Sequence, residues 1–449
     1  MVKKTLLALG LISMVFPLAA YASEADIAAL SVGLDSLWVM LAFILVLLMQ
    51  GGFILLEAGS TRMKNAGHVA GKTIFTVALA AIVYWAVGYG VIFGSGGISG
   101  FMGWDSIFLN PPTSVLEGES LPTSVFFLFQ FAFAAISLSI AWGGFAERAK
   151  LASYVVFTLF YVSFIYPIVA HWIWGGGWLA NHGAQDFAGS TVVHLTGATA
   201  ALVATLLLKP RIGKFNKDGS PNEILGHNQV FTALSVLLLW VGWFGFNAGS
   251  TVAIGDGFFA YVGFTTLIAA GAGGLAALII SWIVGGKSDI TAMLNGVLGG
   301  LVAITASCAF VEPWAAAVIG LIAGVLVFYS VKMFNKLKID DPIYALSVHG
   351  MAGIWGTLAN GLFATPELAD KVGVGQAGLF YGGGIKQLWV QFESVAVAFV
   401  FVFAASFIVL YVMKLIIGFR VSEEQEIVGL DLSEHGVYGY PEQLTKKAE

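Results

Sequence analysis

Charged residues and cysteines are scarce in this sequence. Only 10% of its 449 residues are Asp, Glu, Lys or Arg, whereas 58% are hydrophobic and the mean hydropathy is +0.88. Because a soluble domain carries about 25% charged residues, the deficit excludes an ordinary soluble protein. The single cysteine, Cys308, excludes an internal disulfide framework and a metal site built from several cysteines. The composition is that of a chain that crosses a lipid bilayer several times, and nothing in it indicates nucleic-acid binding.

The first 22 residues have the pattern of a secretory signal peptide. Lys3 and Lys4 precede the apolar run 6–16, and Ala20-Tyr21-Ala22 forms a small-x-small cleavage site. We therefore expect the mature chain to begin at Ser23. The alternative is an uncleaved first helix, which would raise the number of spans by one.

Eleven later windows are long and apolar enough to cross about 30 Å of hydrocarbon. They cover residues 37–56, 72–93, 125–145, 151–171, 190–208, 228–247, 258–284, 290–307, 314–334, 343–364 and 392–417. The sequence thus predicts a membrane domain over residues 23–417 and a C-terminal tail over residues 418–449.

The distribution of positive charge predicts the orientation of these spans. With Ser23 placed outside, the outer connections hold only Lys371 and Lys386 of the 21 lysines and arginines, and nearly all the others fall on the inner side. Since positively charged loops stay in the cytoplasm, we expect the N-terminus outside and the tail inside.

Two histidines, His194 and His349, lie within predicted spans, in the stretches GSTVVHLTGATAALVATLLL and LSVHGMAGIWGTLANGLF. An ionisable side chain at that depth is costly and generally functional, and histidine changes protonation near neutral pH. We therefore expect the pair to line a pathway. For either residue alone, the alternative is a neutral histidine bonded to a backbone carbonyl.

The same histidines indicate an internal repeat. Each follows a valine and precedes a glycine, Gly197 or Gly353, on the fifth and the tenth predicted span. Because five is odd, a duplicated five-helix unit inserts upside down relative to its partner, as in many transporters. The predicted fold is an all-α membrane protein of eleven transmembrane helices, with an inverted five-helix repeat and one extra C-terminal helix.

Aromatic residues gather near the predicted outer ends of three spans, next to a serine hydroxyl. Aromatic faces attract cations, so we expect a small cation to be held there by cation–π contact and one hydroxyl. An aromatic belt at the membrane interface is the alternative, especially for Trp172 and Trp178. The residues that form the expected site are Phe129, Phe133, Trp174, Phe246 and Ser250.

Asp186 and Trp243 lie close to these residues in the sequence. Asp186 precedes Gly189-Ser190-Thr191 and is expected to cap the fifth span, where a buried carboxylate would also favour a nearby cation. Trp243, judged alone, is more typical of a core residue.

Four segments, in order, strongly resemble the Amt/Mep/Rh ammonium transporters, in particular the bacterial Amt branch. The resemblance covers essentially the whole mature chain. The segments are DFAGSTVVHLTGATAALVATLLLKPR (186–211), GWFGFNAGS (242–250), DDPIYALSVHGMAGIWGTL (340–358) and GFRVSEEQEIVGLDLSEHG (418–436).

This resemblance implies roles for the residues already singled out. An external ammonium recruitment site, supported by Asp186, is matched by Phe133, Trp174 and Ser250. A stacked phenyl gate is matched by Phe133 and Phe246, and the outer aromatic lining by Phe129. The pore itself is matched by Trp243 in its wall and by the twin histidines His194 and His349.

The resemblance also implies an assembly and partners. It implies a homotrimer in a bacterial inner membrane, with one pore per subunit and no cofactor or metal. Its substrate would be ammonium, with methylammonium as an analogue, and its cytoplasmic tail would bind the PII signalling protein. The chain departs from the family pattern at Phe131, where a smaller residue is common, and at Val437, where many relatives have glutamate.

Two other classes of function were weighed against a transporter. One is an ammonium sensor that acts through its tail and a PII partner, although the stretch after Arg420 holds no signalling domain. The other is a membrane metalloenzyme that uses the two histidines as ligands; the sequence lacks a motif such as HExxH, so we expect no enzymatic activity.

Overall fold

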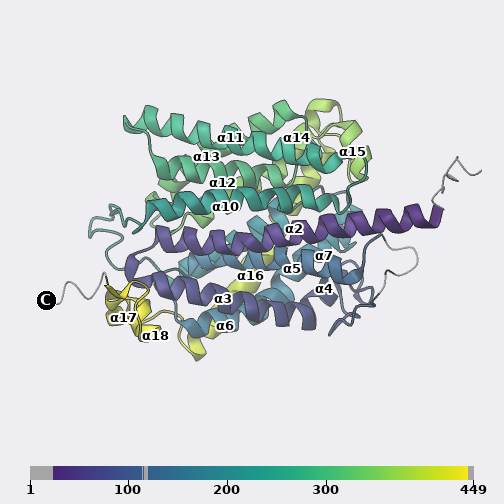
Figure 1. Ribbon diagram of the computed structural model, residues 1–449. Coiled ribbons are helices and arrows are strands. Elements are labelled where there is room, and N and C mark those ends of the chain that lie inside the picture. The colour runs from purple at the N-terminus through teal and green to yellow at the C-terminus, as the bar shows by residue number, and fades with distance from the viewer. Residues whose placement is uncertain (1–23, 114, 116–119, 443–449) are drawn as a thin grey trace, which may run out of the picture.

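The computed structural model describes residues 24–113, 115 and 120–442, so the predicted signal peptide lies outside the described residues. The long helices run side by side in one bundle (Figure 1). The tail helices α17 (Glu423–Val428) and α18 (Leu430–His435) lie at one end of the bundle, and α15 (Pro366–Val372) lies at the other. We call these the tail-side end and the opposite end.

Nine helical stretches in the described ranges are long and apolar enough to cross a membrane. Two predicted spans are not among them: 290–307 is the 16-residue helix α12, and 343–364 holds the π-helical turn η7 followed by the 12-residue helix α14. Eleven transmembrane helices and an inverted repeat therefore stay predictions. The nine stretches are Ile27–Ser60, Met63–Phe93, Thr123–Gly144, Leu151–Asn181, Ser190–Leu208, Gln229–Thr251, Phe258–Gly285, Pro313–Lys336 and Lys386–Ile416.

Most of these stretches combine α-helix with a short 3-10 or π turn, and one small hairpin lies between the second and third. In chain order the remaining elements are α2 (Glu24–Ser60), η1 (Met63–Asn65), α3 (Ala66–Val83), η2 (Tyr84–Gly88), α4 (Tyr89–Phe93), β1 (Gly97–Ile98), β2 (Met102–Gly103), α5 (Thr123–Ala141), η3 (Trp142–Gly144), α6 (Leu151–Phe160), η4 (Tyr161–Ile165), α7 (Tyr166–Trp174), α8 (Trp178–Asn181), η5 (Ser190–Leu195), α9 (Thr196–Leu208), α10 (Gln229–Asn247), η6 (Ala248–Thr251), α11 (Phe258–Gly285), α12 (Ile290–Thr305), α13 (Pro313–Lys336), η7 (Leu346–Met351), α14 (Ala352–Phe363), η8 (Leu379–Tyr381) and α16 (Lys386–Ile416). The two strands pair antiparallel, with Gly97 opposite Gly103.

Three helices, α2, α3 and α16, start clearly earlier than the hydropathy windows predict. Helix α2 begins at Glu24, and its first turns reach past the bundle with exposed apolar side chains such as Ile27 and Leu30 (Figure 1). Helix α3 begins at Ala66, where Lys72 lowers the local hydropathy. Lys72 is nevertheless buried, because its Nζ lies 2.5 Å from Glu57 Oε2. A window of residue hydropathies does not register such pairing.

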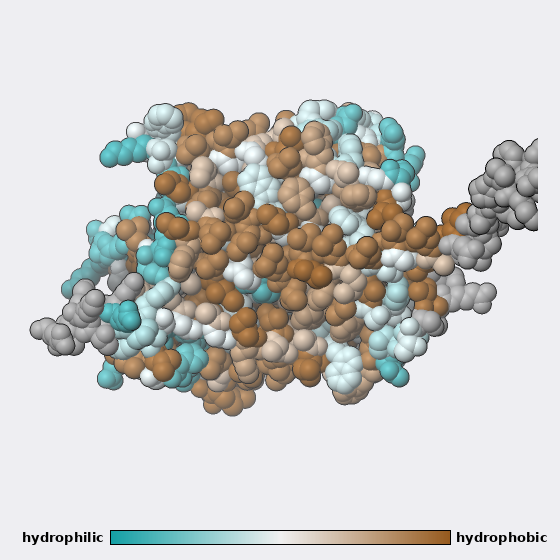
Figure 2. Space-filling view, viewed as in Figure 1, coloured by the Kyte–Doolittle hydropathy of each residue, from teal (hydrophilic) through white to brown (hydrophobic). Residues whose placement is uncertain are grey.

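The surface has the distribution expected of a membrane protein. In Figure 2 hydrophobic residues form a broad belt around the middle of the bundle, and hydrophilic residues gather at its two ends. Inside, glycines let helices approach closely: a Cβ on Gly324 of α13 would lie 2.2 Å from the carbonyl oxygen of Gly273 on α11. The outcome is a tightly packed bundle whose polar interior groups are concentrated in a few places.

Candidate functional site

His194 and His349 meet in the interior of the bundle. His194 lies on η5 and His349 on η7, and at most 5% of either residue is exposed. Their Nδ1 atoms lie 3.2 Å apart, and their rings are stacked with an interplanar angle of 14°. Sequence reasoning placed both residues on one pathway, and the structure brings them into direct contact across 155 residues of chain.

This contact constrains the protonation of the pair. In a hydrogen bond between two Nδ1 atoms one ring must donate and the other must accept, so two neutral histidines adopt opposite tautomers. One Nε2 is then a donor and the other an acceptor. Nε2 of His194 is buried and has no hydrogen-bond partner among the described residues. The pair therefore offers polar atoms to a small guest that both donates and accepts hydrogen bonds.

A π-helical turn carries each histidine. Such turns are rare, occur frequently at functional sites, and free backbone groups that a membrane helix must satisfy elsewhere. In η5 neighbouring side chains fill this need: Ser137 Oγ donates to the Val193 carbonyl at 2.8 Å, and Thr196 Oγ1 donates to the Thr191 carbonyl at 3.0 Å. These bonds hold the backbone beside His194 in place.

An aspartate stands eight residues before each histidine, and the two have the same local role. The carboxylate of Asp186 accepts four backbone N–H bonds, from residues 189–192, so it caps η5 as its position in the sequence predicts. The carboxylate of Asp341 accepts N–H bonds from Ala345 and Leu346 at the start of η7. Burial raises the pKa of Asp186 to about 6 and that of Asp341 to about 7, although the N–H bonds oppose this rise.

A residue with a left-handed backbone lies three positions after each aspartate. It is Gly189 in the first segment, with φ of 113°, and Tyr344 in the second, with φ of 62°. Glycine adopts this conformation readily, whereas a tyrosine there is an outlier. The spacing of aspartate, left-handed residue and histidine is therefore the same in two segments far apart in the chain.

Aromatic rings lead from the histidines to the opposite end. Phe246 lies 5.5 Å from His194 between ring centroids, and Phe133 lies 4.2 Å from Phe246. Both phenylalanines are almost fully buried, so the rings close the way between the histidines and the surface. Trp243 stacks on His194 at 5.2 Å and is held by a bond from its Nε1 to Thr305 Oγ1. The structure thus brings together the predicted gate, wall and histidine residues.

The remaining predicted residues lie around the outer side of Phe133. Trp174 meets Phe133 edge-on at 5.8 Å, and Phe129 meets it at 4.8 Å. Nε1 of Trp174 donates to the backbone carbonyl of Asp186 at 2.8 Å, so Asp186 also orients the indole ring. Ser250, on η6, donates its hydroxyl to the Phe246 carbonyl at 2.8 Å and keeps lone pairs free to accept from a guest.

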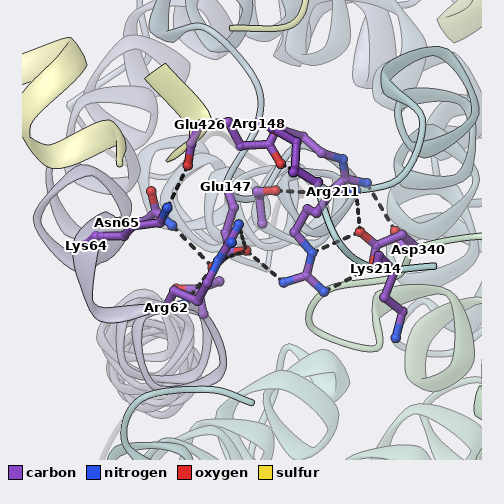
Figure 3. A network of polar contacts seen from close by, with 12 residues as sticks. Arg62, Lys64, Asn65, Glu147, Arg148, Arg211, Lys214, Asp340 and Glu426 are labelled. Carbon is purple, nitrogen blue, oxygen red and sulfur yellow. Dashed lines mark hydrogen bonds and ion pairs between the residues drawn. The ribbon is translucent and has the colours of Figure 1, made fainter. Parts of the chain in front are cut away.

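Charge is concentrated at the tail-side end, in a network that the sequence did not reveal. Glu147 lies between Arg62 and Arg211, at 2.9 and 2.8 Å, and Arg211 also pairs with Asp340 at 2.9 Å (Figure 3). Burial opposes the ionisation of Glu147, but the two guanidinium groups outweigh it and lower the pKa to about 2. The network ties together four connections that are remote in sequence.

The tail docks at or beside three of these connections through its carboxylates. Glu426 accepts from Ile212 N at 2.7 Å, Asp431 from His68 N at 2.7 Å, and Glu434 from Leu151 N at 2.9 Å. The last two carboxylates lie at the N-termini of α3 and α6, where the helix dipole favours negative charge. The sequence shows that the tail is acidic, but it does not indicate which backbone groups its carboxylates bind.

Among the described residues, no three His, Cys, Asp or Glu side chains are placed to hold a metal ion.

Sequence analysis did not single out Asp341 or the ion network. For Asp341 a signal was present in the spacing, because Asp341 stands as far before His349 as Asp186 stands before His194. The ion network has no such signature, because Glu147, Arg211 and Asp340 meet only in the folded chain.

The fold and this site define a multi-pass helical membrane protein with two buried, stacked histidines beside a row of aromatic rings. The model of the Ammonium Transporter Family matches residues 37–440. The chain therefore belongs to that family.

Individual relatives agree with this assignment. The chain is 40% identical over 435 residues to ammonium transporter Amt2 of Archaeoglobus fulgidus, covering 92% of this chain and 90% of that one. It is 35% identical to the ammonium transporter of Bacillus subtilis, covering 91% and 99%. Among solved structures, a protein titled "Sensor Amt Protein" matches with a TM-score of 0.85 and 36% identity over 91% of this chain and 99% of that one. Candida albicans Mep2 matches with a TM-score of 0.81 and 29% identity over 91% and 90%.

Proposed function

We propose that this protein transports ammonium: it recruits the cation at Trp174, Phe133 and Ser250, the cation gives up a proton to water at the phenyl gate, and ammonia passes along the two histidines, with or without separate transfer of that proton. The observation that carries the proposal is one line of ring contacts, from Trp174 through Phe133 and Phe246 to His194 and His349, with successive centroids 4.2 to 5.8 Å apart. The line runs from the surface at the opposite end into the bundle.

The free energies involved favour conduction of neutral ammonia over conduction of the ammonium cation. A cation–π contact contributes about 0.5 to 2 kcal/mol, whereas a charge in the membrane interior costs at least about 3 kcal/mol. Two or three aromatic faces therefore hold a cation at the mouth but do not carry it through. Desolvation lowers the pKa of a buried amine by up to about 3 to 5, so loss of a proton is the least costly route. Potassium has no proton to lose, and this difference supplies selectivity.

The proposal extends to topology and assembly. The matched spacing of aspartate, left-handed residue and histidine supports an inverted repeat within eleven spans, with the tail in the cytoplasm of a bacterial cell and the protein in its inner membrane. Residues 1–22 would be removed as a signal peptide. The protein would form a homotrimer with one pore per subunit, and PII would contact the tail.

A role as a sensor is the second candidate. It is favoured by the likeness to the structure titled "Sensor Amt Protein" and by the docking of the tail on connections that lead directly to the pore helices. In this reading a cation at the mouth changes the docking of the tail, and little ammonium crosses.

Flux measured in liposomes separates the two candidates. Purified protein should give currents or pH changes with pulses of ammonium and none with potassium. If the charged form is recruited, flux at fixed total ammonium should not rise tenfold per pH unit as free ammonia does. No flux together with retained ammonium binding would favour the sensor, and a tenfold slope would indicate a passive gas pore.

A further inference from the structure

A cavity lies at the tail-side end of the bundle, beyond the histidines. Its volume is about 300 Å³, and its lining includes Ser347, Tyr344 and Asp341 from the segment that carries His349. Ser347 stands two residues before His349 on η7. The cavity thus adjoins the inner end of the line of rings, and the proposed transport mechanism assigns it no role.

Ser347 is an unusual feature of this lining. Its residue is 1% exposed, and Oγ has no hydrogen-bond partner among the described residues. A buried hydroxyl almost always finds a partner, so an unpaired one in the wall of a cavity indicates a guest that bonds to it. A guest with N–H groups would use the lone pairs of this oxygen.

The charges around the cavity favour a cation. Asp289 and Glu223 line it together with Asp341, and so does Lys214, whose Nζ donates to the Asn222 carbonyl and has no ion-pair partner among the described residues. Arg211 also lines it, but its guanidinium is already engaged by Glu147 and Asp340. The carboxyl groups therefore outnumber the uncompensated positive charge.

The local geometry repeats that of the recruitment mouth. Asp186 caps η5 and orients Trp174, while Asp341 caps η7 in the same register and lines the cavity together with Ser347. The aromatic faces of the outer mouth are replaced here by carboxylates. A cation would therefore be held by oxygen atoms at this end and by ring faces at the other.

We propose that this cavity is an inner ammonium-binding site, in which Ser347 Oγ and the carboxylates of Asp341 and Asp289 accept hydrogen bonds from the cation. The inference rests on the proposed function, and it adds that ammonium presented from the tail side has its own saturable site, distinct from Trp174 and Ser250.

The test compares the two sides of the membrane in oriented proteoliposomes. Ser347→Ala should raise the half-saturating ammonium concentration by about 3- to 30-fold when ammonium is supplied on the tail side, because one hydrogen bond to a charged group is lost. It should leave the value for the opposite side unchanged, and Trp174→Leu should do the reverse. Ser406→Ala is the matched control, since Ser406 Oγ is also buried and unpartnered but lies on α16, outside this lining.

A binding measurement keeps the site testable if transport fails. Ammonium chloride, relative to sodium chloride, should raise the thermal unfolding temperature of the Trp174→Leu variant by mass action, and adding Ser347→Ala should remove that rise. Loss of all flux with this stabilisation intact would reject the proposed function and keep the site. The site is rejected if Ser347→Ala and Asp289→Asn leave both the tail-side half-saturation and the stabilisation by ammonium unchanged.

Discussion

At the opposite end of the bundle, Trp174, Phe133 and Ser250 surround the mouth with ring faces and a neutral hydroxyl. At the tail-side end, Glu147 and Arg211 are buried ions that hold connections together. The two ends therefore differ in whether their central side chains carry a fixed charge. The side chains named at the first end carry no fixed charge, whereas the buried ions at the second end are held by opposite charges and, for Arg148, by backbone carbonyls.

The largest effect is expected between the two ends, at the histidine pair. His194→Ala or His349→Ala should abolish selective ammonium transport and leave a folded protein, because each change removes polar atoms from the path without emptying a large volume of the packed wall. Uptake of methylammonium in liposomes measures this, and the exposed His182→Ala is a control. Wild-type rates in both single variants would show that the histidines are structural.

At the tail-side end, the stability of the protein should depend on Glu147. Glu147→Gln leaves Arg211 with an incompletely compensated buried charge, so we expect a loss of about 3 to 5 kcal/mol in the free energy of unfolding. Unfolding in mixed micelles measures the loss. Glu424→Gln, on an exposed residue of α17, should change it little. Equal stability of the two variants would contradict the structural role of the network.

The same residue predicts a pH dependence. Because the pKa of Glu147 is lowered from 4.5 to about 2, its ionised form stabilises the fold above about pH 4.5, and this contribution is lost as the pH falls toward 2. The difference in stability between wild type and Glu147→Gln should therefore be constant near neutrality and shrink below pH 4.5. A difference that is unchanged at pH 3 would contradict this assignment.

At the opposite end, the effects should be smaller and confined to affinity. Trp174→Leu and Ser250→Ala each remove an interaction of about 0.5 to 2 kcal/mol, so apparent affinity for ammonium should fall a few-fold to about thirtyfold. Maximal transport should fall less, because the barrier for ammonia lies deeper, beside His194. Trp178→Leu, in the neighbouring aromatic belt, is the control. Unchanged affinity in both variants would overturn recruitment of the cation at this mouth.

The smallest effect on conduction is expected from removal of the tail. Deleting residues 422–449 removes Glu426, Asp431 and Glu434 from their backbone partners but takes away no ring of the path. Conduction should persist at a reduced level, and PII binding should be lost. A fully active truncation that still binds PII would exclude the tail from regulation.

Much of the candidate site could be found in the sequence because membrane interiors make polar residues costly. His194 and His349 stand out against apolar surroundings, and Asp186 stands at a helix start, where a cap is expected. The spans were predicted by the same contrast. The windows were less accurate where polar residues pair with each other, as Lys72 does with Glu57.

Other features arise only when remote segments meet. Three features depend on packing between helices: the contact between two Nδ1 atoms, the tilted contact of Phe133 with Phe246, and the Ser347 hydroxyl, which has no partner among the described residues. The π-helical turns are also not predicted by hydrophobic periodicity, because the one extra residue in such a turn does not change the composition of the segment.

The sequence by itself determined the membrane class, most of the spans and the identity of the residues with chemistry, because solvation by lipid acts on each residue independently of its distant neighbours. Tertiary structure alone decided how those residues combine. It paired the histidines, brought Phe133 against Phe246 and assembled Glu147, Arg211 and Asp340 into one network, since hydrogen bonds and ion pairs act only over a few ångströms and the partners lie tens to hundreds of residues apart.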